Sequence, residues 1–259
     1  EPQSTNLVSY SEDFSDASWT KTNSSITSNA VISPDGTLNA DKLVENSTTG
    51  EKLTQTIISV TNSTIYTASV FVKYGGREWI RFTDAQSSNR IHFNTKTGVF
   101  GSVTGTVISY KSTVLGDGWY KLSLTTTSVA TAYAIRITLA ENDNDVSYTG
   151  DGASGVYIWG AQVEQKSYAT SYIPTDGASA TRNQELCNNA TPVINSEEGT
   201  LYAEISKIEL SSTSGAISIS DSTTSNRIVV NGLTSSIENR YSITFKVNNT
   251  DLYSQNITL

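Results

Sequence analysis

Polar and aromatic side chains in the middle of the chain have the chemistry that sugar recognition requires. Six of them, each in the polar phase of an alternating strand-like run, are Trp79, Arg81, Arg90, His92, Asn94 and Arg136. An indole on a sheet face can stack on the C–H face of a pyranose, while arginine and asparagine side chains hold its hydroxyl groups. If these runs share one sheet, the six side chains would form one concave glycan-binding face. The alternative is a solvated or subunit-facing sheet, with Trp79 covered by a neighbouring loop or chain.

The residues that catalysis needs are scarce. His92 is the only histidine, and no nucleophile-elbow motif accompanies it. Cys187 is the only cysteine, which excludes an intrachain disulfide and a cysteine-rich zinc site. The acidic residues lie mainly at turns and strand ends, and the sequence has no phosphate loop, dinucleotide fingerprint or metalloprotease helix. We therefore expect a protein that binds a ligand and is not an enzyme.

Period-two alternation identifies the elements that would position the glycan-binding side chains. The runs 78–83, 90–94, 120–124 and 133–139 each place apolar residues on one face and polar residues on the other. The run 67–72 is apolar enough to be a largely buried strand. Turns rich in glycine and aspartate separate these runs, and no helical period persists over three turns. The pattern predicts an all-β fold, in which Trp19, Trp119 and Trp159 serve core packing.

Composition and charge agree with this fold class and limit the partners. Of 259 residues, 36% are apolar and only 16% are charged, a composition that suits a β-sandwich whose strands are half solvated. The net charge of −8 argues against a nucleic-acid partner held by a basic surface. No apolar run approaches the ~18 residues of a membrane span, so we expect no membrane insertion.

The composition changes between residues 176 and 198, where small and polar residues predominate. We predict a first domain over residues 1–182, a linker over 183–198 and a second β domain over 199–259. The predicted strands of the second domain are 201–205, 216–219, 227–230 and 241–247. About 60 residues are few for an independent sandwich core, so we expect a truncated domain or one completed by a neighbouring chain.

Three separated motifs resemble those of bacteriophage tail-fibre and virion proteins. They are Asn6-Leu7-Val8-Ser9-Tyr10-Ser11-Glu12-Asp13-Phe14 with Trp19-Thr20-Lys21, then Gly116-Asp117-Gly118-Trp119-Tyr120-Lys121, and finally residues 159–175 with Ala180-Thr181-Arg182. The resemblance implies a jelly-roll β-sandwich similar to carbohydrate-binding modules. Tail fibres are commonly trimers, so the resemblance also implies a homo-oligomer, for which a trimer is one option. Residues 198–204 resemble the start of a lectin-like sandwich, whose later strands are missing here.

The same resemblance implies a structural metal ion. Carbohydrate-binding jelly rolls often hold one between the first segment and the last strand, and Glu12, Asp13 and Glu164 are the residues nearest those positions. Hard carboxylate oxygens fit Ca²⁺. The acidic run 142–145 lacks the glycine and distant glutamate of a calcium-binding loop, so we expect a polar hairpin tip there.

Three functions are compatible with these residues. The leading one is a non-enzymatic phage virion module, an adhesin on a tail fibre or appendage that binds host-surface glycans and contacts other virion proteins. The second is a purely structural head-fibre or decoration protein. The third is a carbohydrate-binding module of a secreted bacterial polysaccharide-degrading enzyme. The first two place the protein on the virion surface and all three place it outside the cell; the fold alone does not choose between them.

Overall fold

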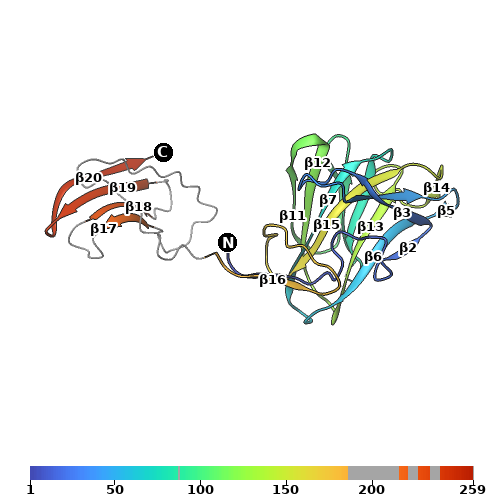
Figure 1. The fold of residues 1–259 in the computed structure, drawn as a ribbon, viewed down its shortest axis with the longest axis horizontal. Helices are drawn as coiled ribbons and strands as arrows, with labels where there is room; N and C mark the ends of the chain where they lie inside the picture. The colour runs from blue at the N-terminus through green and yellow to red at the C-terminus, as the bar shows by residue number, and fades with distance from the viewer. Residues whose placement is uncertain (87, 186–215, 221–226, 234–239, 259) are drawn as a thin grey trace. The chain divides into compact units, whose positions relative to one another are not determined.

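The computed structural model describes residues 1–86, 88–185, 216–220, 227–233 and 240–258 (Figure 1). The chain divides into two compact units, Glu1–Asn188 and Asn189–Leu259. Every regular element in the described ranges is a β-strand, apart from a single 3-10 turn over Gly116–Gly118. The predicted all-β class is therefore confirmed. The boundary between the units falls inside the predicted linker, of which residues 186–198 lie outside the described ranges, as does Cys187.

The first unit is a β-sandwich of two six-stranded antiparallel sheets. The first sheet has the order β10 (Val99–Thr104), β9 (Asn89–Asn94), β8 (Trp79–Asp84), β13 (Ala132–Ala140), β6 (Lys52–Ser59), β2 (Thr20–Thr22). The second has the order β11 (Val107–Val114), β12 (Trp119–Thr127), β7 (Ile65–Tyr74), β15 (Gly155–Glu164), β4 (Ala40–Glu45), β3 (Ser24–Val31). Two short pairs join β1 (Ser4–Asn6) to β16 (Ala180–Arg182) and β5 (Thr49–Gly50) to β14 (Tyr148–Thr149).

The interior between the two sheets follows the alternation in the sequence. The apolar phases of β8, β9, β12 and β13 all enter one core and have no exposed surface: Ile80, Phe82, Ile91, Phe93, Leu122, Leu124, Tyr133, Ile135, Ile137 and Leu139. Because successive strand residues point to opposite faces, the intervening residues of β8, β9 and β13 must lie on the outside of the first sheet, and those of β12 on the outside of the second. The predicted in-and-out pattern of these strands is confirmed.

The tryptophans predicted to pack in a core are buried, though in two different places. Trp19 joins the main core, where its ring centroid lies 4.5 Å from that of Phe14. Trp119 and Trp159 instead form a smaller cluster with Ala40 and Phe71, separate from the main core. Between Trp159 and Gln162 the register shifts at Gly160, whose φ of +61° favours glycine. A Cβ atom at this glycine would also lie only 2.8 Å from the Phe71 ring.

The second unit contains a four-stranded antiparallel sheet in sequence order. Its strands are β17 (Ala216–Ser220), β18 (Arg227–Leu233), β19 (Arg240–Val247) and β20 (Thr250–Thr258). The predicted strands 216–219, 227–230 and 241–247 correspond to the first three. The predicted strand 201–205 and the lectin-like segment 198–204 lie outside the described residues. Across both units, the described ranges contain no helix that is long and apolar enough to cross a membrane.

Candidate functional site

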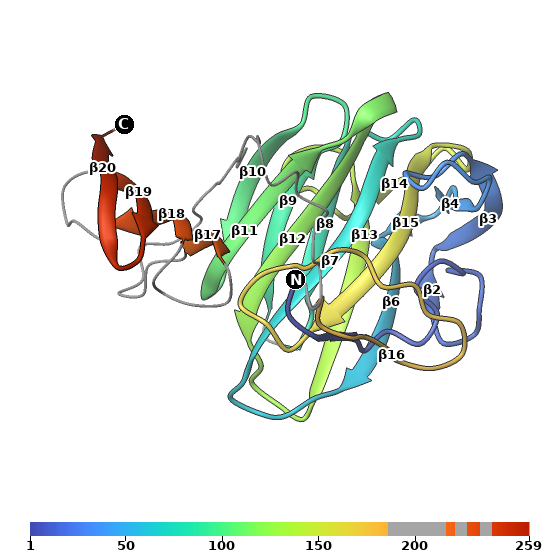
Figure 2. The same cartoon turned by 60° about the vertical axis from the view of Figure 1, so that its left-hand side comes forward.

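The chain covers the outer face of the second sheet with its own segments. The N-terminal segment and the segment after β15 pass across that sheet (Figure 2). Tyr172, from the later segment, packs its ring 4.6 Å from Trp159 and 5.9 Å from Phe71, measured between centroids. Asn6 fastens the two segments, since its Nδ2 donates to the carbonyl oxygens of Ala161 and Ile173.

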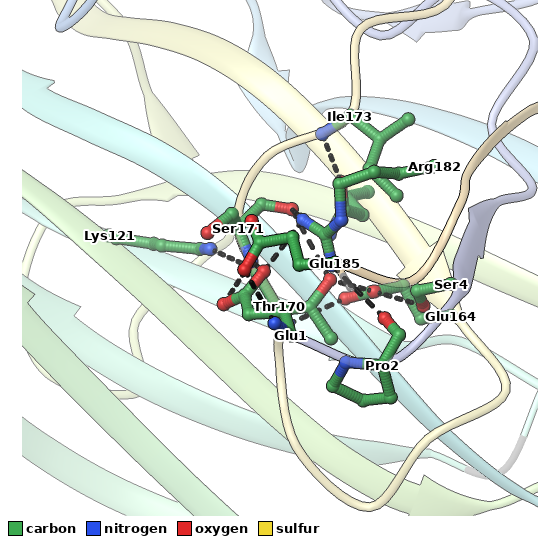
Figure 3. Close-up of polar contacts among 11 residues, drawn as sticks. Glu1, Pro2, Ser4, Lys121, Glu164, Thr170, Ser171, Ile173, Arg182 and Glu185 are labelled. Atoms are coloured by element: carbon green, nitrogen blue, oxygen red, sulfur yellow. Dashed lines mark hydrogen bonds and ion pairs between the residues drawn. The ribbon is translucent and has the colours of Figure 1, made fainter. Parts of the chain in front are cut away.

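Glu164 belongs to this covering layer. Its carboxylate is buried and accepts hydrogen bonds from Ser4 Oγ, Thr170 Oγ1 and the Thr170 backbone N–H (Figure 3). Lys121 Nζ donates to the carbonyl oxygen of Thr170 at 2.6 Å. The Glu164 carboxylate thus links the segment after β15 to β1 by accepting hydrogen bonds from uncharged donors.

The other two carboxylates of the predicted calcium site are also engaged elsewhere. Glu12 accepts from Asn39 Nδ2 and Tyr172 Oη, and Asp13 Oδ1 caps a turn by accepting from the N–H groups of Ser15 and Asp16. Within the described part of the chain, no three His, Cys, Asp or Glu residues are grouped to hold a metal ion. Glu12, Asp13 and Glu164 therefore do not fit the ion as a set, because both oxygens of Glu12 and Glu164, and Oδ1 of Asp13, accept hydrogen bonds within the protein. Calcium binding itself stays a prediction from the resemblance.

The outer face of the first sheet carries most of the predicted glycan-binding residues on its central strands β13, β8 and β9. Two rows of side chains cross these strands: Thr138, Arg81 and His92 in one, and Arg136, Thr83 and Arg90 in the other. We call these six residues the arginine face. Neighbouring strands lie about 4.8 Å apart and alternate residues about 7 Å apart, so the face covers roughly 10 by 7 Å. This is the scale of one or two sugar rings.

Two of the three arginines are held by residues that the sequence analysis did not identify. Arg81 Nη2 lies 3.1 Å from Glu51 Oε1, and Arg136 Nε donates to Gln55 Oε1 at 2.7 Å. Gln55 lies directly opposite Arg136 on β6, about 80 residues away in the chain. Among the described residues, the buried Nε of Arg90 has no hydrogen-bond partner. Alternation in β6 could have predicted that Gln55 faces outward, but not that it binds Arg136.

His92 is held in one tautomer by the edge strand. The pairing of β9 with β10 is irregular between Phe100 and Val103, and this brings the carbonyl oxygen of Ser102 to 3.1 Å from His92 Nδ1. A carbonyl oxygen only accepts, so Nδ1 carries the ring proton. Burial lowers the pKa of His92 below its usual 6.5, against the opposing effects of Ser102 and Asp143. The ring is therefore neutral at pH 7 and its Nε2 presents a lone pair.

The hairpin tip at residues 142–145 reaches this edge of the first sheet. Asn142 and Asp145 bridge, and Asn144 adopts φ of +63° in the turn, as predicted for a polar tip. Asp143 then accepts from the N–H and Oγ of Ser102 and lies 3.9 Å from His92 Nδ1. The tip thus places one carboxylate at the border of the arginine face.

Trp79 and Asn94 lie opposite each other at the border of the arginine face. Trp79, the first residue of β8, is half-buried, and its ring lies against Gly101, where an added Cβ would approach within 2.7 Å of Cζ3. Asn94 is buried, and its Oδ1 accepts from the N–H groups of Lys96 and Thr97 in the turn before β10. Asn94, the last residue of β9, therefore uses its amide oxygen to hold the following turn, and its role in glycan binding stays a prediction.

The arginine face is more buried than alternation alone suggests, and many of its polar atoms lack partners. Arg81 is 7% exposed and His92 has no exposed surface. Within the described residues, eleven buried side-chain nitrogen or oxygen atoms have no hydrogen-bond partner. Five of them belong to this one face: Arg81 Nε, Thr83 Oγ1, Arg90 Nε, His92 Nε2 and Thr138 Oγ1. Buried polar groups are almost always hydrogen-bonded, so such a concentration marks a place where a polar ligand or ordered water fits.

Comparisons with known proteins give only distant structural likenesses. Neither a protein-family model nor a curated protein matches the chain. One similar structure is that of the CBM22-1 and GH10 modules of endo-1,4-β-D-xylanase 10B from Clostridium thermocellum, complexed with xylohexaose, at 14% identity and a TM-score of 0.35 over 67% of this chain and 30% of that one. Another is the enzymatically active domain of tailspike protein 4 of bacteriophage CBA120, at 14% identity and a TM-score of 0.36 over 61% of this chain and 21% of that one.

This chain spans less than a third of the length of either structure. Likeness at this level carries no argument about function. The function has to be inferred from the arginine face itself.

Proposed function

We propose that the first unit is a non-catalytic carbohydrate-binding module and that the arginine face, with Trp79 at its border, binds a glycan. The observation that carries this proposal is the group of five unpartnered buried polar atoms on one sheet face. A saccharide supplies hydroxyl groups that both donate and accept, which is what a mixed set of guanidinium, hydroxyl and imidazole atoms can satisfy. The half-buried indole of Trp79 offers a stacking surface beside them.

We further propose that this module belongs to a phage tail fibre or appendage and that the glycan lies on the host surface. This part rests on the three motifs at the start, middle and end of residues 6–182. It is tested separately from sugar binding, by locating the protein in purified particles with a specific antibody. A position at a distal tip supports adhesion, and a position in a shell or shaft contradicts it.

Sugar binding is tested by retention on a panel of immobilised bacterial polysaccharides. The wild-type protein should be retained on at least one of them. Trp79→Ala should weaken retention by about 1 kcal/mol, or roughly fivefold, because a stacking contact is lost. Tyr168→Ala is the control, since Tyr168 is an exposed aromatic residue beyond β15. Absence of retention on every polysaccharide, or an equal effect of both substitutions, would refute the proposal.

A purely structural role in the virion is the second candidate, and the edges of the two sheets favour it. Apolar side chains are exposed on β10 and β11, among them Val99, Ile108, Tyr110 and Val114. The two strands adjoin, since the rings of Phe100 and Tyr110 lie 4.9 Å apart. Exposed apolar residues gathered at one edge suit contact with another subunit. Ile108→Lys should dissociate such an oligomer in analytical ultracentrifugation if this edge is the contact.

A further inference from the structure

The arginine face has an excess of positive charge in a chain that is acidic overall. Arg81, Arg90 and Arg136 lie on three adjacent strands, whereas the nearby carboxylates are those of Glu51 and Asp143. Glu51 lies 3.1 Å from Arg81, and Asp143 is hydrogen-bonded to Ser102 at the edge of the face. The net charge of the whole chain is −8, so surface composition does not explain three arginines in one place.

The unpartnered atoms of these arginines are all donors. Guanidinium groups donate and never accept, and the Nε atoms of Arg81 and Arg90 are buried without a hydrogen-bond acceptor. The two residues lie diagonally across β8 and β9, because Arg81 is opposite His92 and Arg90 is opposite Thr83. A diagonal pair of this kind is about 7–8 Å apart at the backbone, within reach of one small group between the two side chains. One acceptor group between the two strands could therefore meet donors from both side chains.

His92 adds a single acceptor next to these donors. Its Nδ1 is bound to the Ser102 carbonyl oxygen, and Nε2 is buried and unpartnered. The ring faces Arg81 across the pair of strands, with Arg90 two residues away on its own strand and Asp143 on the opposite side. Because His92 has no exposed surface, a ligand reaches Nε2 only when a neighbouring side chain moves away from the ring. A bound group that attracts the arginines would cause this movement.

We propose that the saccharide bound by the arginine face carries an anionic group, a carboxylate, between Arg81 and Arg90, and a free hydroxyl group directed at Nε2 of His92. This inference rests on the proposed function and names its ligand class. A carboxylate accepts from two guanidinium groups at once and compensates the charge that the face would otherwise bury. A neutral sugar leaves Arg90 without a counter-charge, so it should bind more weakly. A phosphodiester has the same acceptor chemistry and is separated from a carboxylate by experiment.

The test compares acidic bacterial polysaccharides before and after chemical reduction of their carboxyl groups to hydroxymethyl groups. The full chain should bind at least one native polymer, and reduction should weaken binding about tenfold or more, the loss expected for a charge-assisted hydrogen bond. Arg90→Gln should cause a similar loss on the native polymer and little change on the reduced one. Lys111→Gln removes an exposed cation from β11 in the other sheet and should change neither. Raising the salt concentration should weaken binding of the native polymer only.

The outcomes separate this inference from the proposed function. Equal binding to native and reduced polymers, with Trp79→Ala weakening both, overturns the anionic ligand while sugar binding stands. Binding to no polymer overturns both. Binding to a teichoic-acid polymer but to no carboxylated one, with the same dependence on Arg90, supports the anionic group and identifies it as a phosphate. Unfolding midpoints from tryptophan fluorescence check that each variant is folded, and Arg90→Lys, which keeps the charge, should retain part of the binding.

Discussion

Replacing Glu45 by glutamine should destabilise the first unit strongly, because this carboxylate is the acceptor of a buried network. Glu45 has no exposed side-chain surface. Its Oε1 accepts from Arg77 Nη2 at 2.6 Å and from the Asp151 N–H at 2.9 Å. Its Oε2 accepts from Arg77 Nε at 3.0 Å and from Tyr148 Oη at 2.6 Å. Four donors from three residues therefore converge on one charged group.

The loss of stability in Glu45→Gln can be judged from the donors and the charge that remain without a partner. Glutamine keeps one oxygen but turns an NH₂ group toward donors, so at least two of the four lose their acceptor. Arg77, whose side chain is 17% exposed, would also keep its charge without a counter-charge. Breaking a buried ion pair by removing one partner costs about 3–5 kcal/mol. For a unit of this size the melting temperature should fall by roughly 6–20 °C.

Tryptophan fluorescence measures this unit selectively in the full chain. All four tryptophans, at positions 19, 79, 119 and 159, belong to the first unit. Denaturant unfolding followed at the tryptophan emission therefore reports the unit that contains Glu45. Wild type and Glu45→Gln should show a similar dependence of the free energy of unfolding on denaturant concentration, but different midpoint concentrations.

Glu78→Gln is the matched control, because Glu78 forms an ion pair of the same length. Its Oε1 lies 2.6 Å from Lys96 Nζ, but the two side chains are 41% and 55% exposed. Solvent screens such a pair, so this substitution should move the midpoint little. The two ion pairs have the same length and differ in burial, so burial should cause the difference in stability. A Glu45→Gln variant no more destabilised than Glu78→Gln would refute this cause.

Three further predictions concern titration and packing. Burial lowers the pKa of His92, so its ring should titrate below pH 6.5 by NMR. As the pH falls, the unfolded chain binds a proton at His92 before the folded chain does. The free energy of unfolding should therefore decrease as the pH drops below about 6.5. Burial raises the pKa of Asp41 to about 6. Between about pH 4 and pH 6 the folded protein keeps the Asp41 proton, whereas the unfolded chain releases it. The stability that Asp41 contributes at low pH should therefore be lost as the pH rises through this range. Denaturant unfolding of Asp41→Asn across this range should lack that component, and an unchanged profile would contradict the assignment. Gly101→Ala should displace Trp79 and Asp143, cost about 1–3 kcal/mol and weaken glycan retention, while Gly116→Ala, with no atom near its added Cβ, should do neither.

Alternation in the sequence was sufficient to predict the class of fold and the two phases of the central strands. A period of two leaves each side chain only two directions, and burying Ile80, Phe82, Ile91 and Phe93 forces their neighbours outward. For this reason Arg81, Arg90, His92 and Arg136 could be assigned to one face from sequence alone, once their strands were taken to pair. The burial of Trp19, Trp119 and Trp159 was predictable in the same way, from their size and apolar surroundings.

Only the tertiary structure decided which groups these side chains meet. Gln55 reaches Arg136, and Ser102 reaches His92, through strand pairing and an irregular register that no local pattern encodes. Asp143 arrives from a hairpin tip, and Asn94 turns out to hold a turn, because such contacts depend on where the backbone bends. The tertiary structure likewise decided the separate hydrogen-bond partners of Glu12, Asp13 and Glu164, which the resemblance had grouped. Sequence specifies the face of a strand by local periodicity, but partners across a sheet are set by the packing of distant segments.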